Sequence, residues 1–456
     1  MNKACVVISD LHVGNGTRGG DHFFEPQQDA LEGLLAALGP DGPLGGAEPL
    51  ELVLNGDSFD FLLLLREPDR VRTDAAYGVA KVERVIAAHP RFFAALRRFL
   101  AAPERQITFT IGNHDIELCY ADVRDRVRQA IGAAVGQVRF CLSQAYEPRA
   151  GVTIEHGCQY DPWNSVGELW DGAWPVLGLL DDGREHMAAS PGALPLPWGT
   201  RYYYHAFWTA RQRYRYVAEF IPLPSGLSTL ALLCLIAPEV VIEGLPRTAD
   251  LLAQPAPIPA AEEIPGQGND AAALFAVSAP TLIALQREVA AQFGTPLSAR
   301  AEARIQQGQK ALYEALDAPS PLDALAVIFP ATSDRSTNLI EQDSRSRGML
   351  LRDERLRCAL TGHTHLEGTL RLPGGKLLVD TGTWMPRLYL PGESERTPEV
   401  MRWLAEPDAA PSPLRDATRF PFALLQMRDD EPATVQLCEW VGGRSGRSQV
   451  LPLAGG

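Results

Sequence analysis

Five short apolar runs that each end in a polar turn constrain the fold of this chain more than any other feature. The runs are rich in Val, Ile and Leu, and glycine, asparagine, aspartate or histidine follows each of them. Short apolar runs bounded by turn residues are typical of strands that are buried on both faces. With their turns, the runs are KACVVISD, LELVLNGD, RQITFTIGNHD, GVTIEHG and ERLRCALTGHTH.

Helical patterns lie between the runs in the first third of the chain. QQDALEGLLAALG and HPRFFAALRRFLAA both place apolar residues at helical spacing. Alternation of strands and helices indicates an α/β fold, with helices covering the faces of a sheet. The strand pattern returns near the C-terminus, in KLLVDTGTW, FALLQMRD and TVQLCEWV.

The middle of the chain has a different composition. Residues 166–200 are rich in Pro, Gly and Trp, and 253–268 form a proline-rich linker. Helical patterns between and after them predict that 166–345 is a mainly helical insertion. These patterns cover 202–220, 270–293 and 297–317.

Polar residues stand at the carboxyl ends of the five predicted strands. Loops at these ends of an α/β sheet meet in one crevice, so residues distant in sequence are expected to converge. Carboxylate, imidazole and amide groups together suit divalent ions such as Mn²⁺, Fe²⁺ or Zn²⁺. The residues are Asp10, His12, Asp57, Asn113, His114, His156, His363 and His365.

Each of these residues also has a plainer interpretation when it is taken singly. Asp10 or Asp57 alone would most often cap a helix. His156 alone would more often be a buried histidine with a hydrogen-bond partner than a metal ligand. The pair Asn113-His114 also suits a turn. Only the whole set, in this order, favours a metal site.

The set as a whole resembles the motif blocks of the calcineurin-like metallophosphoesterases. The matching blocks are SDLHVG, NGDSFD, GNHD, EHG and GHTH, in the family's order, and each follows a predicted strand. The resemblance covers 1–165 and 350–440. It implies a two-sheet α/β sandwich of metallophosphoesterase type, built from 1–165 and 346–456, which carries the helical insertion or cap.

The resemblance also implies two divalent metal ions, Mn, Fe or Zn, and a ligand role for each matched residue. Asp57 would bridge the two ions, and a hydroxide between them would be the nucleophile. The implied ligands are Asp10, His12 and His365 for the first ion and Asn113, His156 and His363 for the second.

Two further residues of the GNHD block would be catalytic by the same resemblance. His114 would contact a phosphoryl oxygen or protonate the leaving group, and Asp115 would orient its ring. Among the neighbouring loops, Asp161 is expected to support the histidine loop as a hydrogen-bond acceptor. Asn15 and Asp21 are expected to cap the loop after His12, with substrate contact as the alternative.

These features predict a hydrolase that acts on a phosphoester or a phosphoanhydride. The loop after D-x-H, NGDSFDF and the large insertion are also similar to the UDP-diacylglucosamine pyrophosphatases, which would make a nucleotide-linked lipid the substrate. That subgroup has arginine where this chain has His114, so simpler phosphoesters and nucleotides are alternatives. A nuclease, a phosphoprotein phosphatase and a non-catalytic binding scaffold are further alternatives, although such scaffolds usually lose metal ligands that are all present here.

Charge and apolar content bear on partners and compartment. The formal net charge of −14 argues against a nucleic-acid surface across the whole chain. The longest apolar stretch, 226–238, is shorter than the roughly 20 residues of a membrane span, which favours a buried helix or a membrane-surface contact. Seven cysteines without a CxxC pair and a start without a secretory signal predict a cytoplasmic protein, free or peripheral to a membrane.

Overall fold

The computed structural model covers residues 1–456. Apart from short gaps it describes 3–165 and 348–451, with scattered positions from 180 to 221 between them. The chain divides into two compact units. One comprises Met1–Pro197, Asn338–Pro386 and Thr418–Gly456, and the other comprises Trp198–Thr337 and Arg387–Ala417.

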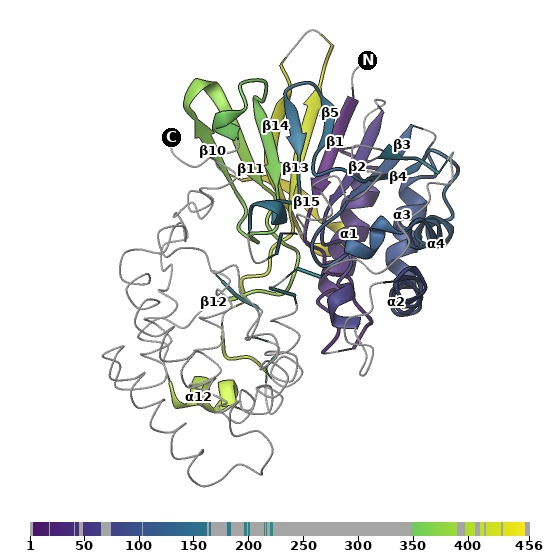
Figure 1. Ribbon diagram of the computed structural model, residues 1–456. Coiled ribbons are helices and arrows are strands. Elements are labelled where there is room, and N and C mark those ends of the chain that lie inside the picture. Colours follow the sequence, from purple (N-terminus) through teal and green to yellow (C-terminus); the bar gives the residue numbers. More distant parts are fainter. Residues whose placement is uncertain are drawn as a thin grey trace, which may run out of the picture. The chain divides into compact units, whose positions relative to one another are not determined.

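The first unit contains a sheet of eight strands in the order β15-β14-β13-β1-β2-β3-β4-β7 (Figure 1). Its centre is parallel, and antiparallel strands complete both edges, so the sheet is mixed. The parallel strands are β1 (Lys3–Ile8), β2 (Leu50–Asn55), β3 (Arg105–Thr110) and β4 (Val138–Cys141). The antiparallel strands are β7 (Leu180–Asp181), β13 (Pro421–Met427), β14 (Thr434–Val441) and β15 (Arg447–Val450).

A second sheet of five strands, in the order β10-β11-β9-β6-β5, belongs to the same unit. Its three central strands, β6, β9 and β11, run parallel, and they join segments that are some 200 residues apart in sequence. The strands are β5 (Tyr146–Arg149), β6 (Val152–Ile154), β9 (Cys358–Thr361), β10 (Gly368–Leu372) and β11 (Lys376–Asp380).

Alternation along β1 divides the core into two layers. Cys5 and Val7 point toward the second sheet, where they join a buried cluster with Ile154 and Leu360. Val6 and Ile8, the intervening residues, join the cluster on the opposite face. This period of two is what a strand covered on both sides requires.

Four helices cover that opposite face of the eight-stranded sheet (Figure 1). Each places apolar residues three or four positions apart on the sheet, such as Leu31 and Leu34 in the first and Phe92 and Leu96 in the third. Asp74 caps the second helix by accepting from the Tyr77 amide at 2.9 Å. The helices are α1 (Glu25–Ala37), α2 (Ala75–Ala88), α3 (Pro90–Phe99) and α4 (Ala121–Ile131).

The predicted α/β class and all five motif-bearing strands are confirmed, and the two sheets pack as a sandwich. The predicted insertion, 166–345, lies almost entirely outside the described residues, so its helical character stays a prediction. Within the described part of the second unit, β8 (Phe220–Ile221) pairs with β12 (Leu388–Tyr389), and α12 spans Pro398–Ala405.

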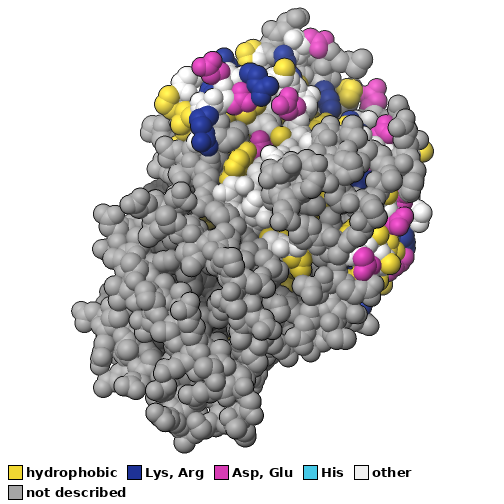
Figure 2. Space-filling view, viewed as in Figure 1, with side chains coloured by type: hydrophobic (Ala, Val, Ile, Leu, Met, Phe, Trp, Pro, Cys, Tyr) yellow, Lys and Arg dark blue, Asp and Glu magenta, His cyan; other side chains and the backbone are white. Residues whose placement is uncertain are grey.

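Among the described residues, no helix combines the length and the apolar character needed to traverse a membrane. The apolar stretch 226–238 falls outside them. In the described part of the face that Figure 2 shows, acidic and basic side chains are interspersed.

Candidate metal centre

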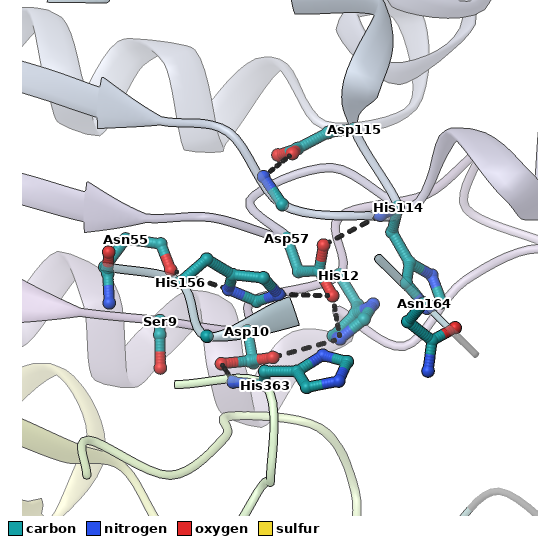
Figure 3. A network of polar contacts seen from close by, with 12 residues as sticks. Ser9, Asp10, His12, Asn55, Asp57, His114, Asp115, His156, Asn164 and His363 are labelled. Atoms are coloured by element: carbon teal, nitrogen blue, oxygen red, sulfur yellow. Dashed lines mark hydrogen bonds and ion pairs between the residues drawn. The ribbon is translucent and has the colours of Figure 1, made fainter. Parts of the chain in front are cut away.

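The loops that follow β1, β2, β3, β6 and β9 meet at one end of the two sheets, and Figure 3 shows their side chains converging. Backbone hydrogen bonds tie these loops to one another. The His12 amide donates to the Asp57 carbonyl at 2.9 Å, and the Gly362 amide donates to the His156 carbonyl at 3.0 Å. Asp10, Asp57 and His156 are almost completely buried.

Unusual backbone conformations mark the same loops. Among the described residues other than glycine, positive φ angles, from 48° to 69°, occur only at five positions. A left-handed conformation costs a residue with a side chain about 1–3 kcal/mol, and it persists where surrounding contacts enforce it. The five positions are Asp10, His12, Asp57, His363 and His365, and the sequence predicts a metal ligand at every one.

Two glycines allow the loops to approach so closely. A Cβ at Gly112 would lie 2.1 Å from Asp57 Oδ1, and one at Gly56 would lie 2.4 Å from the ring of His156. No side chain fits at these distances, so the motif glycines are required by the site itself.

The first cluster consists of Asp10, His12 and His365, whose potential ligand atoms lie within 4.8 Å of one another. The Nε2 atoms of the two histidines are 3.3 Å apart, and His365 Nε2 is 3.1 Å from Asp10 Oδ1. Apart from its ion-pair contacts with these two rings, Asp10 Oδ1 forms no hydrogen bond among the described residues. Two imidazole nitrogens and a carboxylate oxygen that converge on one point fit a divalent ion.

The second cluster consists of Asp57, His156 and His363. His156 Nδ1 lies 3.1 Å from the Asn55 carbonyl, which can only accept, so Nδ1 carries the hydrogen and Nε2 faces Asp57 Oδ2 at 3.2 Å. Within the described structure, the buried Asn113 Oδ1 forms no hydrogen bond, and His156 Nε2 has the Asp57 carboxylate opposite it. A buried acceptor without a partner, beside an imidazole and a carboxylate, suits a metal-binding role.

Asp57 belongs to the second cluster and also faces the first. Its Oδ2 is 3.8 Å from His12 Nε2 in the first and 3.2 Å from His156 Nε2 in the second. Its other oxygen accepts from the His114 amide at 2.8 Å. One oxygen of Asp57 therefore faces ligands of both clusters.

The electrostatics of the site combine buried carboxylates with imidazoles. Burial alone would raise the pKa of Asp10, but the neighbouring histidines hold it well below its usual value. Burial lowers the pKa of His12 and His156, yet the surrounding carboxylates outweigh it and raise these values to about 10 and about 9. Without a metal, protons on the imidazoles balance the negative charge.

His114 borders the clusters and is partly exposed. Its Nδ1 lies 3.0 Å from Asp60 Oδ1, and the other oxygen of Asp60 lies 3.4 Å from His12 Nδ1. The ring partner of His114 is thus Asp60, which the sequence analysis did not single out. Its signal was present in the NGDSFD block, where Asp60 follows Asp57 by three positions.

The predicted role of Asp115 as the orienting group for His114 is therefore wrong. Asp115 is completely buried and accepts hydrogen bonds from the backbone amides of Gly112, Ser58 and Phe59, at 2.8, 2.8 and 3.3 Å. Its side chain turns back to join the loops after β2 and β3. Burial and the nearby Asp57 carboxylate raise its pKa to about 7.

The loop after His12 confirms the expected capping roles. Asp21 accepts from the amides of Gly14 and Phe23 at 3.0 and 2.7 Å, and Asn15 Oδ1 accepts from the Thr17 amide at 3.0 Å. These side chains organise the loop itself.

Searches against models of known protein families and against curated proteins found no match for this chain. What points to a function is therefore the arrangement of the chain's own residues.

Proposed function

We propose that the protein is a binuclear metal-dependent hydrolase of the calcineurin-like metallophosphoesterase type, which cleaves a phosphoester or a phosphoanhydride. One observation carries the proposal: a single oxygen of Asp57, a member of the second His/Asp cluster, also faces His12 of the first. Asp10, His12 and His365 would hold one ion, His156, His363 and Asn113 the other, and Asp57 both.

The chemistry that two divalent ions supply in such a centre is a hydroxide at neutral pH and a polarised phosphoryl group. The donor set fits Mn²⁺, Fe²⁺ or Zn²⁺, because it combines oxygen with imidazole nitrogen. The strained backbone of the ligand loops also supports the proposal, since strain of this kind collects at functional sites.

His114 would act as the general acid. Asp60 is a carboxylate and accepts, so His114 Nδ1 carries the hydrogen and Nε2 faces away from this partner. The ring is 24% exposed, whereas that of His12 is 1% exposed, so only His114 of this pair can reach a substrate. With both ring nitrogens protonated, His114 would keep the Nδ1 hydrogen on Asp60 and give the Nε2 proton to the leaving oxygen, which would complete the hydrolysis.

The substrate class we propose is a phosphorylated small molecule. Histidine at position 114 favours simple phosphoesters or nucleotides over the nucleotide-linked lipids of the arginine-bearing subgroup. The lipid alternative rests on the insertion, which lies outside the described residues.

The test is a turnover assay on protein loaded with Mn²⁺ or Zn²⁺, with aryl phosphate mono- and diesters, nucleoside diphosphates and a nucleotide-linked lipid as substrates. His114→Ala should lower turnover by about 10²–10⁴-fold while both ions remain bound, because removal of a general acid has this size of effect. Asp353→Ala, which alters an exposed pair with Arg355, is the control and should match the wild type.

Wild-type protein that binds two ions and hydrolyses none of these substrates would contradict the proposal and favour a binding scaffold. Full turnover in His114→Ala would remove the general-acid role alone.

A further inference from the structure

Asp161 lies in the loop after β6, which also carries the proposed ligand His156. Its side chain extends to the candidate metal centre. Its Oδ2 lies 3.2 Å from His363 Nε2. A carboxylate oxygen accepts, so this contact places the ring hydrogen of His363 on Nε2. The remaining nitrogen, Nδ1, is then the one with a free lone pair.

The loop that carries Asp161 is built to hold the carboxylate in place. Asn164 Nδ2 donates to the same Oδ2 at 2.7 Å, and the Ser165 amide donates to the Asp161 carbonyl at 2.7 Å. The preceding turn, η3 (Cys158–Tyr160), is anchored by Glu155, which accepts from Gln159 Nε2 at 2.7 Å and from the Tyr160 hydroxyl at 2.5 Å.

The Asp161 loop also packs directly on the histidine loop. Gly157 has a φ of 108°, and a Cβ there would lie 3.4 Å from the Gly362 carbonyl and 3.6 Å from His363 Cβ. The hydrogen bond from the Gly362 amide to the His156 carbonyl joins the two loops at the same point. The ring of His363 is thus positioned by a neighbouring loop as well as by its own backbone.

We propose that Asp161 is a positioning residue that fixes the tautomer and orientation of His363, so that this histidine presents Nδ1 to the ion it shares with Asp57 and His156. This inference rests on the proposed function and deepens it. It divides the second cluster into His156, which offers Nε2, and His363, which offers Nδ1. Carboxylate partners of this kind set ligand basicity, and their loss typically weakens metal binding by about 10–100-fold.

The experiment measures metal binding and ring tautomer rather than turnover. Mn²⁺ is titrated into wild-type protein, Asp161→Ala and Asp161→Asn, with calorimetry for affinity and electron paramagnetic resonance for paired against isolated ions. In parallel, ¹⁵N-histidine NMR on the Zn²⁺-loaded and metal-free proteins reports which nitrogen of His363 carries the hydrogen. Asp353→Ala is the control, because its carboxylate has the same 28% exposure as that of Asp161 but pairs with Arg355.

We expect Asp161→Ala to bind one of the two ions about 10–100-fold more weakly and to lose the Nε2–H signature of His363. Asp161→Asn keeps an oxygen that accepts from Nε2 and should stay within a few-fold of the wild type. Asp353→Ala should match the wild type in both measurements.

Two outcomes would overturn the proposal. Wild-type affinity for both ions in Asp161→Ala would make the contact incidental. A loss in Asp161→Asn as large as in Asp161→Ala would mean that the carboxylate itself binds the ion. Failure of the proposed function would be visible in the wild-type protein instead. Wild-type protein that binds metal but shows no turnover contradicts the proposed function alone. Wild-type protein that binds no Mn²⁺ contradicts both proposals.

Discussion

At the scale of single residues, two aspartates that both adjoin His114 have separate tasks. Asp60 contacts the rings of His114 and His12, whereas Asp115 accepts from three backbone amides. The resemblance to the metallophosphoesterases instead implies that Asp115 orients the His114 ring. The side chain of the next residue leaves in another direction, and a residue from a different loop supplies the ring partner.

This division predicts different losses in two conservative variants. Asp60→Asn should lower turnover by about 10–100-fold, because an amide carries no negative charge to balance positive charge on the rings of His114 and His12. Asp115→Asn should instead lower the free energy of unfolding by about 1–3 kcal/mol, since one buried oxygen acceptor becomes a donor opposite backbone amides. Steady-state kinetics and urea denaturation of both variants provide the measurements. A larger kinetic defect in Asp115→Asn than in Asp60→Asn would restore the original assignment.

At the scale of elements, the sequence predicts the positions of single strands better than it predicts which strands pair. The apolar runs correctly located β1, β2, β3, β6 and β9, because burial on both faces leaves a continuous apolar signal. The edge strand β15, RSQV, is polar and mostly exposed, and carries no such signal. The pairing of β6 with β9 depends on packing between distant segments, which local pattern does not encode.

The candidate site shows the same limit. Motif order predicts the ligand residues but not the left-handed backbone at Asp10 and His363, because Asp and His adopt that conformation more often than most residues yet still in only a small share of cases. The roles of Asp60 and Asp115 depend on how two loops lie against each other. Only tertiary structure contains that information.

The GNHD loop continues into η2 (Ile116–Cys119), which a buried ion pair attaches to α2. Lys81 Nζ contacts Glu117 Oε1, and the two side chains are 1% and 0% exposed. Lys81→Met would leave the Glu117 carboxylate buried without its cation, which typically costs about 3–5 kcal/mol. Urea denaturation should show this loss, and the double variant Lys81→Met/Glu117→Leu should recover much of it.

The matched control joins the same helix α2 to α4 at the surface. Arg126 and Glu83 form an ion pair whose side chains are 26% and 50% exposed. Arg126→Met should cost only about 0–1 kcal/mol, because water screens exposed pairs. Equal losses of unfolding free energy in Lys81→Met and Arg126→Met would show that burial does not make the Lys81–Glu117 pair more important for stability than an exposed pair.

At the scale of the whole molecule, the metal centre links folding to pH. It contains three buried carboxylates, Asp10, Asp57 and Asp60, whose nearest cationic groups are histidines. Protons and divalent ions are therefore alternative ways to neutralise the same charge. The metal-free and metal-loaded proteins should consequently respond to pH in opposite directions.

Metal-free protein should lose stability as the pH rises from about 7 to about 10. The pKa values of His12 and His156 in the folded chain are about 10 and about 9, above the ordinary value of 6.5. Their stabilising contribution is therefore complete below pH 6.5 and disappears as the pH rises through the folded values. His365, whose pKa burial lowers to about 4, is neutral in the folded chain throughout this window, so its effect has the opposite sign and is largely complete by about pH 7.

Metal binding should show the complementary behaviour, because ligand imidazoles must release their protons. At about pH 7, uptake of the ions should release about two protons, from His12 and His156, and affinity should increase toward about pH 9. Titration calorimetry in buffers of different ionisation enthalpy counts the protons, and urea denaturation with and without a chelator follows stability. Metal uptake without proton release, together with a flat stability profile of the chelated protein, would show that these two histidines are neutral before the ions arrive.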